Sequence, residues 1–127
     1  MLLLNFGHPL ADAHLAAIRN LSGCELASVF PIAVHLDQAR PFAEQVRELV
    51  DAVPLTTEQW QTAPLIVNPP TLAPVAAALI AEMHGRSGYF PTLVRLRPIA
   101  DGIAPQFEVA ELLHLQSLRD SARQRRT

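Results

Sequence analysis

The segment that most constrains the fold is Leu2–Leu10, with the sequence LLLNFGHPL. Its first residues are continuously apolar, as in a strand that is covered on both faces of a sheet. Gly7 then permits a tight turn and the close approach of a ligand. Pro9 suits the first turn of a helix, because it has a preset φ and no N–H that needs a partner. This strand–turn–helix pattern is typical of the start of an α/β nucleotide-binding domain.

The rest of the chain repeats this alternation of apolar runs and helical spacing. Helices are expected to begin near Leu10, Phe42 and Pro74 and to end at Gly23, Pro54 and Gly85, with His84 in the last turn of the third. A final short helix has an apolar side, and a turn at Thr57–Thr62 carries Trp60 as a packing anchor. The expected strands are Cys24–Phe30, which can continue as extended chain through Ile32–Leu36, then Leu65–Val67, Thr92–Arg97 and Phe107–Leu113, with a turn at Asp101-Gly102.

The order of these elements predicts the fold class. Strands that alternate with helices form a mostly parallel sheet with helices on both faces, and the last two strands add an antiparallel hairpin at the C-terminal edge. We therefore expect a Rossmann-like α/β fold. Because the chain has 127 residues, a single domain over residues 1–127 is expected.

Composition and charge restrict the classes of partner. The net charge of −2 argues against indiscriminate attraction of long nucleic acid. Cys24 is the only cysteine and cannot form an intramolecular disulfide, which fits a cytoplasmic location. The opening apolar run is too short for a signal peptide, and no run approaches the length of a membrane span. All basic residues are arginine, so any anion site on a side chain would use a guanidinium group.

Two turns are the candidate binding site. In parallel sheets, ligands bind beyond the carboxyl ends of the strands. Asn5–Pro9 follows the first predicted strand, and Asn68–Thr71 follows the third, so each pairs an asparagine with proline just before a helix. Helix N-termini are natural seats for phosphate. For any single asparagine, holding a loop is the more common role, but two at equivalent places indicate a site.

The other candidate residues are weaker evidence for a functional site. His8 could act as an acid or a base near neutral pH, or could simply pack at its turn. His84-Gly85-Arg86 resembles an anion motif, but the helix before it leads away from the predicted cleft, so Arg86 would serve a second chain. No glycine-rich phosphate loop occurs, and the remaining histidines lack the spacing of metal ligands. We therefore expect no metal and no cofactor.

The segments LLLNFGHPL (Leu2–Leu10), HGRSGYFP (His84–Pro91) and LVRL (Leu93–Leu96) resemble the small CRISPR-associated Csx family numbered fifteen, found beside type III CRISPR systems. The resemblance covers nearly the whole chain. It implies a stand-alone relative of CARF domains, which are Rossmann-like modules that bind cyclic oligoadenylate second messengers, usually across a dimer two-fold. The ligand-binding residues would then be the two turns and the arginine already discussed: Asn5, Phe6, Gly7, His8, Pro9, Asn68, Pro69, Pro70, Thr71 and Arg86.

The resemblance leaves three functions open. The first is a homodimer or higher homo-oligomer that binds cyclic tetra-adenylate, with main-chain N–H groups on phosphates and asparagines on adenine, and that damps the antiviral signal by sequestration. The second is a metal-independent ring nuclease that releases linear di-adenylate, with His8 as the catalytic base. The third is a small interaction module without a nucleotide ligand. Only His8 is placed to act as a base, and neither turn contains lysine or arginine, so binding without cleavage is favoured.

Overall fold

The computed structural model describes residues 1–100 and 102–126. Five strands form one sheet in the order β2-β1-β3-β4-β5, in which β4 and β5 are antiparallel and all other pairs are parallel. The strands are β1 (Leu2–Asn5), β2 (Ser28–Pro31), β3 (Leu65–Asn68), β4 (Thr92–Pro98) and β5 (Phe107–His114). The expected Rossmann-like α/β fold, with a mostly parallel sheet and an antiparallel C-terminal hairpin, is confirmed.

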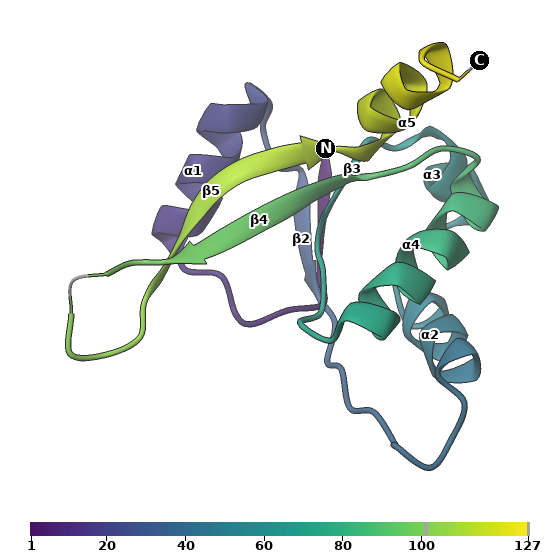
Figure 1. Ribbon diagram of the computed structural model, residues 1–127, viewed down its shortest axis with the longest axis horizontal. Helices are drawn as coiled ribbons and strands as arrows, with labels where there is room; N and C mark the ends of the chain where they lie inside the picture. Colours follow the sequence, from purple (N-terminus) through teal and green to yellow (C-terminus); the bar gives the residue numbers. More distant parts are fainter. Residues whose placement is uncertain (101, 127) are drawn as a thin grey trace.

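The helices are α1 (Asp12–Ser22), α2 (Phe42–Asp51), α3 (Thr57–Thr62), α4 (Ala73–Ser87) and α5 (Leu115–Gln124). Helices α2, α3 and α4 lie together on one side of the sheet, and α1 lies on the other (Figure 1). Because side chains alternate along a strand, Leu4 and Val67 face the first group while Leu3 and Ile66 face α1. The sheet therefore has a core on each face.

Two elements, α1 and the β4–β5 hairpin, cover the core on the α1 face of the sheet. Ile18 of α1 packs on Leu3, Ile66 and Val94, and residues of the β4–β5 hairpin, including Val109 and Leu112, pack against the same cluster. The hairpin thus bends back over α1. An irregularity in the β4–β5 register between Arg95 and Leu96 accompanies this bend, as is usual for a β-bulge.

Helix ends follow the local rules, with one correction. Gly23 ends α1 in the left-handed conformation at φ 68°, as predicted. The predicted end of α4 at Gly85 is wrong, because the helix continues through Arg86 and Ser87 and ends at Gly88, which has φ 84°. Gly88 is the later of two glycines in this stretch, and its N–H donates to the carbonyl of His84.

The predictions for the second strand and for the segment after it need correction, and one predicted turn lies partly outside the described residues. The second strand is shorter than predicted, since Cys24–Ala27 lies outside it, and it occupies the edge of the sheet, where Pro31 is tolerated. Ile32–Leu36 is not a strand, although Ile32, Val34 and Leu36 pack on the core. The turn predicted at Asp101-Gly102 includes Asp101, which lies outside the described residues.

Candidate functional site

The two predicted turns meet at the carboxyl edge of the sheet. Asn5 ends β1 and Asn68 ends β3, and the two residues are register partners in adjacent parallel strands. The Asn68 amide Nδ2 donates to Asn5 Oδ1 at 2.9 Å, and the backbone N–H of Phe6 donates to the carbonyl of Asn68 at 2.9 Å. The equivalence read from the sequence therefore corresponds to direct contact.

The two asparagines hold the turns together. Asn5 Oδ1 also accepts from the N–H of Gly7 at 3.0 Å, and Asn5 Nδ2 donates to the carbonyl of His8 at 3.1 Å. The side chains are buried, with Asn5 6 % and Asn68 4 % exposed. Contacts with a ligand at this edge would consequently fall to their exposed neighbours, not to the two amides.

Gly7 makes the close approach of the turns possible. A Cβ atom at this position would lie 2.8 Å from Asn68 Nδ2 and 3.0 Å from the carbonyl oxygen of Pro69. Any side chain would therefore push the turns apart and disturb the asparagine pair. The glycine predicted as a ligand contact serves here as a packing position between the turns.

A groove lies on the α4 side of the joined turns. We call it the edge groove, and its volume is about 330 Å³. Its walls are the first turn, the segment after β2 and the start of α4, with the lining residues Phe6, Gly7, His8, Ile32, Ala33, Val34, Leu36, Pro70, Thr71 and Leu72. This lining contains no arginine and no carboxylate from the part of the chain that the structure describes. The groove would bind through apolar contact and main-chain groups.

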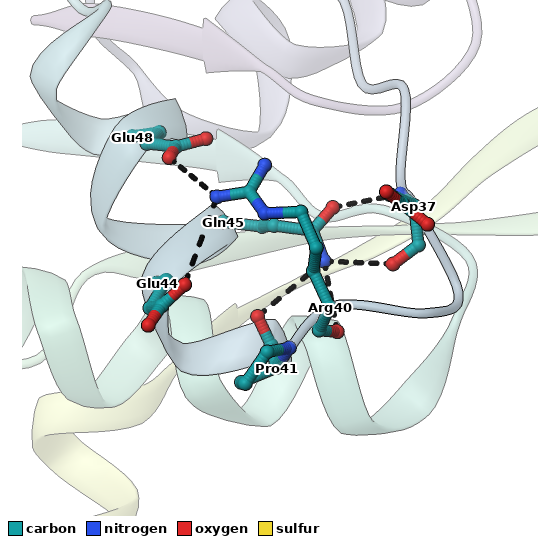
Figure 2. A network of polar contacts seen from close by, with 6 residues as sticks. All are labelled: Asp37, Arg40, Pro41, Glu44, Gln45 and Glu48. Atoms are coloured by element: carbon teal, nitrogen blue, oxygen red, sulfur yellow. Dashed lines mark hydrogen bonds and ion pairs between the residues drawn. The ribbon is translucent and has the colours of Figure 1, made fainter.

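The outer wall of the edge groove is fastened by Gln45 (Figure 2). Gln45 is 4 % exposed on α2, and its Oε1 accepts from the N–H of Asp37 at 2.7 Å. Its Nε2 donates to the carbonyls of Asp37 at 2.9 Å and Arg40 at 3.1 Å. The Arg40 guanidinium lies over the same helix and pairs with Glu48 at 2.7 Å. These bonds fix the end of the Ile32–Leu36 wall on α2.

A second and larger hollow lies on the α1 side of the turns. We call it the hairpin cavity, and its volume is about 640 Å³. Its lining comes from the first turn, the start of α1 and the base of the β4–β5 hairpin, with the residues His8, Pro9, Ala11, Ala13, His14, Thr71, Leu96, Ile99, Pro105, Gln106 and Phe107. His8 and Thr71 line both hollows, so these two exposed residues form the ridge between them.

The two helix N-termini at this edge differ as anion seats. At α1, the N–H of Ala11 is already bound to His14 Nδ1 at 2.9 Å, and Asp12 places a negative charge in the first turn. At α4, the first turn has no acidic residue, and the N–H groups of Thr71, Leu72 and Ala73 have no partner within the described residues. Since the positive end of a helix dipole attracts anions, α4 provides the better phosphate seat.

His8 is the titratable side chain that this edge leaves uncommitted. It is exposed, and its imidazole makes no hydrogen bond to any described residue. The second histidine at the cavity, His14, is engaged at both ring nitrogens, because Nδ1 accepts from Ala11 and Nε2 donates to the carbonyl of Phe107 at 2.8 Å. The carbonyl can only accept, so Nε2 carries the proton. His14 is therefore a structural clip.

Arg86 is not brought to the turns. It lies in the last turn of α4, at the end of the helix that is farther from the carboxyl edge (Figure 1). Its guanidinium donates to Asp51 at 2.7 Å and to Glu82 at 3.0 Å, which joins the C-terminal ends of α2 and α4. A ligand at the edge groove of the same chain would not contact it.

Within residues 1–100 and 102–126, no group of three or more His, Cys, Asp or Glu side chains is placed to hold a metal ion. None of the described helices is long and apolar enough to cross a membrane. No protein-family model, curated protein or solved structure matches the chain.

The sequence prediction missed three contributors to this edge. Ile32–Leu36 forms a wall of the groove, Gln45 fastens that wall, and His14 clips the hairpin to α1. A signal existed for Gln45, because it lies at helical spacing with Phe42 and Leu49 on the apolar side of its helix. A polar residue on such a face needs hydrogen-bond partners when it is buried.

Proposed function

We propose that the chain binds a cyclic oligoadenylate, most simply cyclic tetra-adenylate, at the carboxyl edge in a homodimer, and that it damps type III CRISPR signalling by sequestration. The observation that carries the proposal is the joining of the two turns into one edge. There the N–H groups of Thr71, Leu72 and Ala73, which have no partner among the described residues, lie next to a groove with apolar side chains in its lining. The resemblance in Leu2–Leu10 and His84–Pro91 gives the ligand class.

The recognition would combine main-chain donors with apolar contact. A phosphate would take the N–H groups at the start of α4 together with the Thr71 hydroxyl, which is exposed on the ridge. A base would lie against Ile32, Val34 and Leu36. With a net charge of −2, the chain has no general attraction for polyanions, so selectivity would depend on hydrogen bonds and shape.

The size of the groove supports a dimer. Pockets for drug-sized molecules run from roughly 300 to 1,000 Å³, and the edge groove of about 330 Å³ is at the lower end of that range. It would hold about one nucleotide of a ring that contains four. Two copies related by a two-fold axis would offer the ring two equivalent seats, which matches its own symmetry.

Binding is favoured over cleavage because His8 stands alone. Ring opening needs a ribose 2′-oxygen to attack the neighbouring phosphorus while the 5′-oxygen leaves. One group removes the proton from the 2′-OH, another protonates the 5′-oxygen, and donors stabilise the charge. His8 could take the first role. His14 already uses both ring nitrogens, and the lining of the groove includes no arginine from the described residues.

The test is incubation of the protein with labelled cyclic tetra-adenylate, with a gel shift and product analysis from the same tube. A shifted, intact ring is expected. Linear di-adenylate would instead support the ring nuclease, and His8→Ala should then abolish the product while His114→Ala, an exposed histidine outside both hollows, should not. No shift at micromolar protein would overturn both nucleotide functions and leave the interaction module.

A further inference from the structure

The C-terminal end of the chain carries a concentration of positive charge that the rest of the chain does not share. Four of the ten arginines fall within Arg119–Arg126, which we call the basic segment, and Asp120 is its only acidic residue. The basic segment has a formal charge of +3 and the remaining residues have −5, which together give the net charge of −2. The acidic balance of the whole chain therefore conceals one strongly basic region.

Helix α5, which holds most of the basic segment, stands at a margin of the molecule. It leaves the end of β5 there (Figure 1), and every residue from Ser117 to Arg126 is exposed. Its first turn is nevertheless fixed, because the N–H of Phe90 donates to Gln116 Oε1 at 2.8 Å and Leu115 is partly buried. The arginines are thus presented to solvent on a helix whose base is attached to the segment before β4.

Three of these arginines surround one hollow. Arg119 and Arg123 lie four residues apart on α5 and so share a face of the helix. Arg126 follows the helix, and its N–H donates to the carbonyl of Arg123 at 3.1 Å, which continues the helical turn. Together with Ala122 they line a hollow of about 450 Å³, which we call the arginine hollow. Its described lining contains no carboxylate.

The charge of the arginine hollow is not neutralised by the described residues. Arg119 pairs with Asp120 at 3.0 Å, but Arg123 and Arg126 make no ion pair with any described carboxylate. Elsewhere, exposed carboxylates neutralise arginines on the surface, namely Arg40, Arg86, Arg95 and Arg97. Since like charges four residues apart destabilise a helix, a bound anion would relieve a repulsion that the fold leaves in place.

The form of this site favours a chain of phosphates over a single anion or a membrane. The stripe from Arg119 to Arg126 is about 10 Å long at the rise of a helix, so it needs several negative charges along that length. A nucleic-acid backbone has charges at such close spacing, and the guanidinium fork matches phosphate oxygens. Membrane binding needs a broad apolar face, whereas Leu118 is the only large apolar side chain that is strongly exposed on the described part of α5.

We propose that the basic segment docks the phosphodiester backbone of a single-stranded nucleic acid, with Arg119, Arg123 and Arg126 donating to its phosphates. Contacts to phosphate are independent of base sequence, so RNA and DNA strands are bound alike. The −5 charge of the remaining residues repels the strand, which confines contact to this segment. The site is separate from the carboxyl edge, because His114, just before α5, pairs with Thr92 at the start of β4.

Fluorescence anisotropy with labelled oligouridine and oligothymidine at low salt tests the docking. Both strands are expected to bind with a dissociation constant below about 100 µM, in the range of non-specific binding. Because three arginines would displace counterions, the logarithm of the affinity should fall with the logarithm of the salt concentration with a slope of about −2. Absence of saturable binding in that range, or a slope near zero, would overturn the proposal.

The place of binding is tested by combining Arg123→Gln with Arg126→Gln. Glutamine retains helix propensity, and two of the three phosphate contacts are lost, so the affinity should fall at least about tenfold and the slope to about −0.7. The matched control combines Arg95→Gln with Arg97→Gln, which changes the net charge equally but on β4, where both arginines are paired. It should stay within about twofold of the wild type. Equal losses in the two double variants would refute the docking site.

Vesicles of phosphatidylserine and phosphatidylcholine test the competing membrane surface. The wild type is expected to stay in the supernatant when such vesicles are sedimented at the same salt concentration, since α5 lacks the apolar face that insertion needs. Retention on the vesicles that is abolished by the Arg123→Gln and Arg126→Gln changes would assign the arginine hollow to a membrane surface and overturn the proposal. These measurements use no cyclic nucleotide, so their outcome is independent of the function proposed for the carboxyl edge.

Discussion

At the scale of single residues, Asn5 organises the carboxyl edge. Its side chain makes three hydrogen bonds, to the N–H of Gly7, to the carbonyl of His8 and to the Asn68 amide, and it is 6 % exposed. Sheet pairing places Asn5 beside Asn68, but the side-chain bonds determine how the chain leaves the two strands. The positions of His8 and Thr71 on the ridge depend on this arrangement.

Asn5→Ala is expected to lower the free energy of unfolding by about 2–3 kcal/mol, because three bonds are lost and buried partners remain without replacement. The matched control is Asn20→Ala, an exposed position on α1, which should change stability by less than about 0.5 kcal/mol. Urea unfolding measures both. Equal stability of Asn5→Ala and the wild type would show that the asparagine pair does not hold the turns.

Much of this edge could be predicted from residue type and spacing, because short segments of sequence determine where strands and helices end. The end of β1 near Asn5, the start of α4 next to Pro74 and the meeting of the two turns follow from apolar runs, proline and the rule for parallel sheets. The sequence could not predict that both asparagine amides are used in hydrogen bonds between the turns. This depends on how close two turns lie whose asparagines are 63 residues apart. The sequence does not distinguish Gly85 from Gly88 as the cap of α4, and the structure shows that Gly88 is the cap.

At the scale of elements, Gln45 ties the wall of the edge groove to α2. Replacing it with alanine removes bonds to the N–H and carbonyl of Asp37 and to the carbonyl of Arg40. The exposed ion pair between Arg40 and Glu48 is a weak substitute, since such pairs contribute little in water. The hydrogen bonds that tie Asp37–Arg40 to α2 therefore come mainly from one buried amide.

For Gln45→Ala we expect a loss of about 2 kcal/mol in stability and faster hydrogen exchange at the Asp37 amide, whose acceptor has gone. Gln61→Ala, on the exposed side of α3, is the matched control and should leave that exchange rate unchanged. Exchange at Asp37 that is as slow in Gln45→Ala as in the wild type would show that other contacts hold the wall.

Tyr89 makes a second link between elements. Its hydroxyl donates to the carbonyl of Ala63, which joins the segment after α4 to the segment before β3. Burial raises the pKa of the Tyr89 phenol above its ordinary value of 10.0. Because the folded-state pKa is the higher one, the stability linked to this proton is fully present below the ordinary pKa and is lost as the pH rises through the raised value.

Tyr89→Phe should therefore be about 1 kcal/mol less stable than the wild type at about pH 8, through loss of the hydrogen bond. The difference should shrink at about pH 11, where the wild type loses its proton-linked contribution and the variant has none to lose. Urea unfolding at the two pH values measures this. A difference that stays constant or grows with pH would contradict the assigned burial of the phenol.

At the scale of the whole molecule, the carboxyl edge is where the fold concentrates its exposed, uncommitted groups. The edge groove and the hairpin cavity lie on either side of the ridge formed by His8 and Thr71. The opposite end of α4, by contrast, is closed by the Arg86 ion pairs. A ligand in either hollow would therefore lie at this edge.

Calorimetric titration of the protein with cyclic tetra-adenylate shows directly whether the carboxyl edge binds the ring. We expect saturable binding at micromolar or lower concentration with one ring for every two chains. We also expect about tenfold weaker binding for Thr71→Ala, which removes the hydroxyl on the ridge, and unchanged binding for Thr57→Ala on α3. Absence of binding, or equal affinity of Thr71→Ala and the wild type, would contradict it.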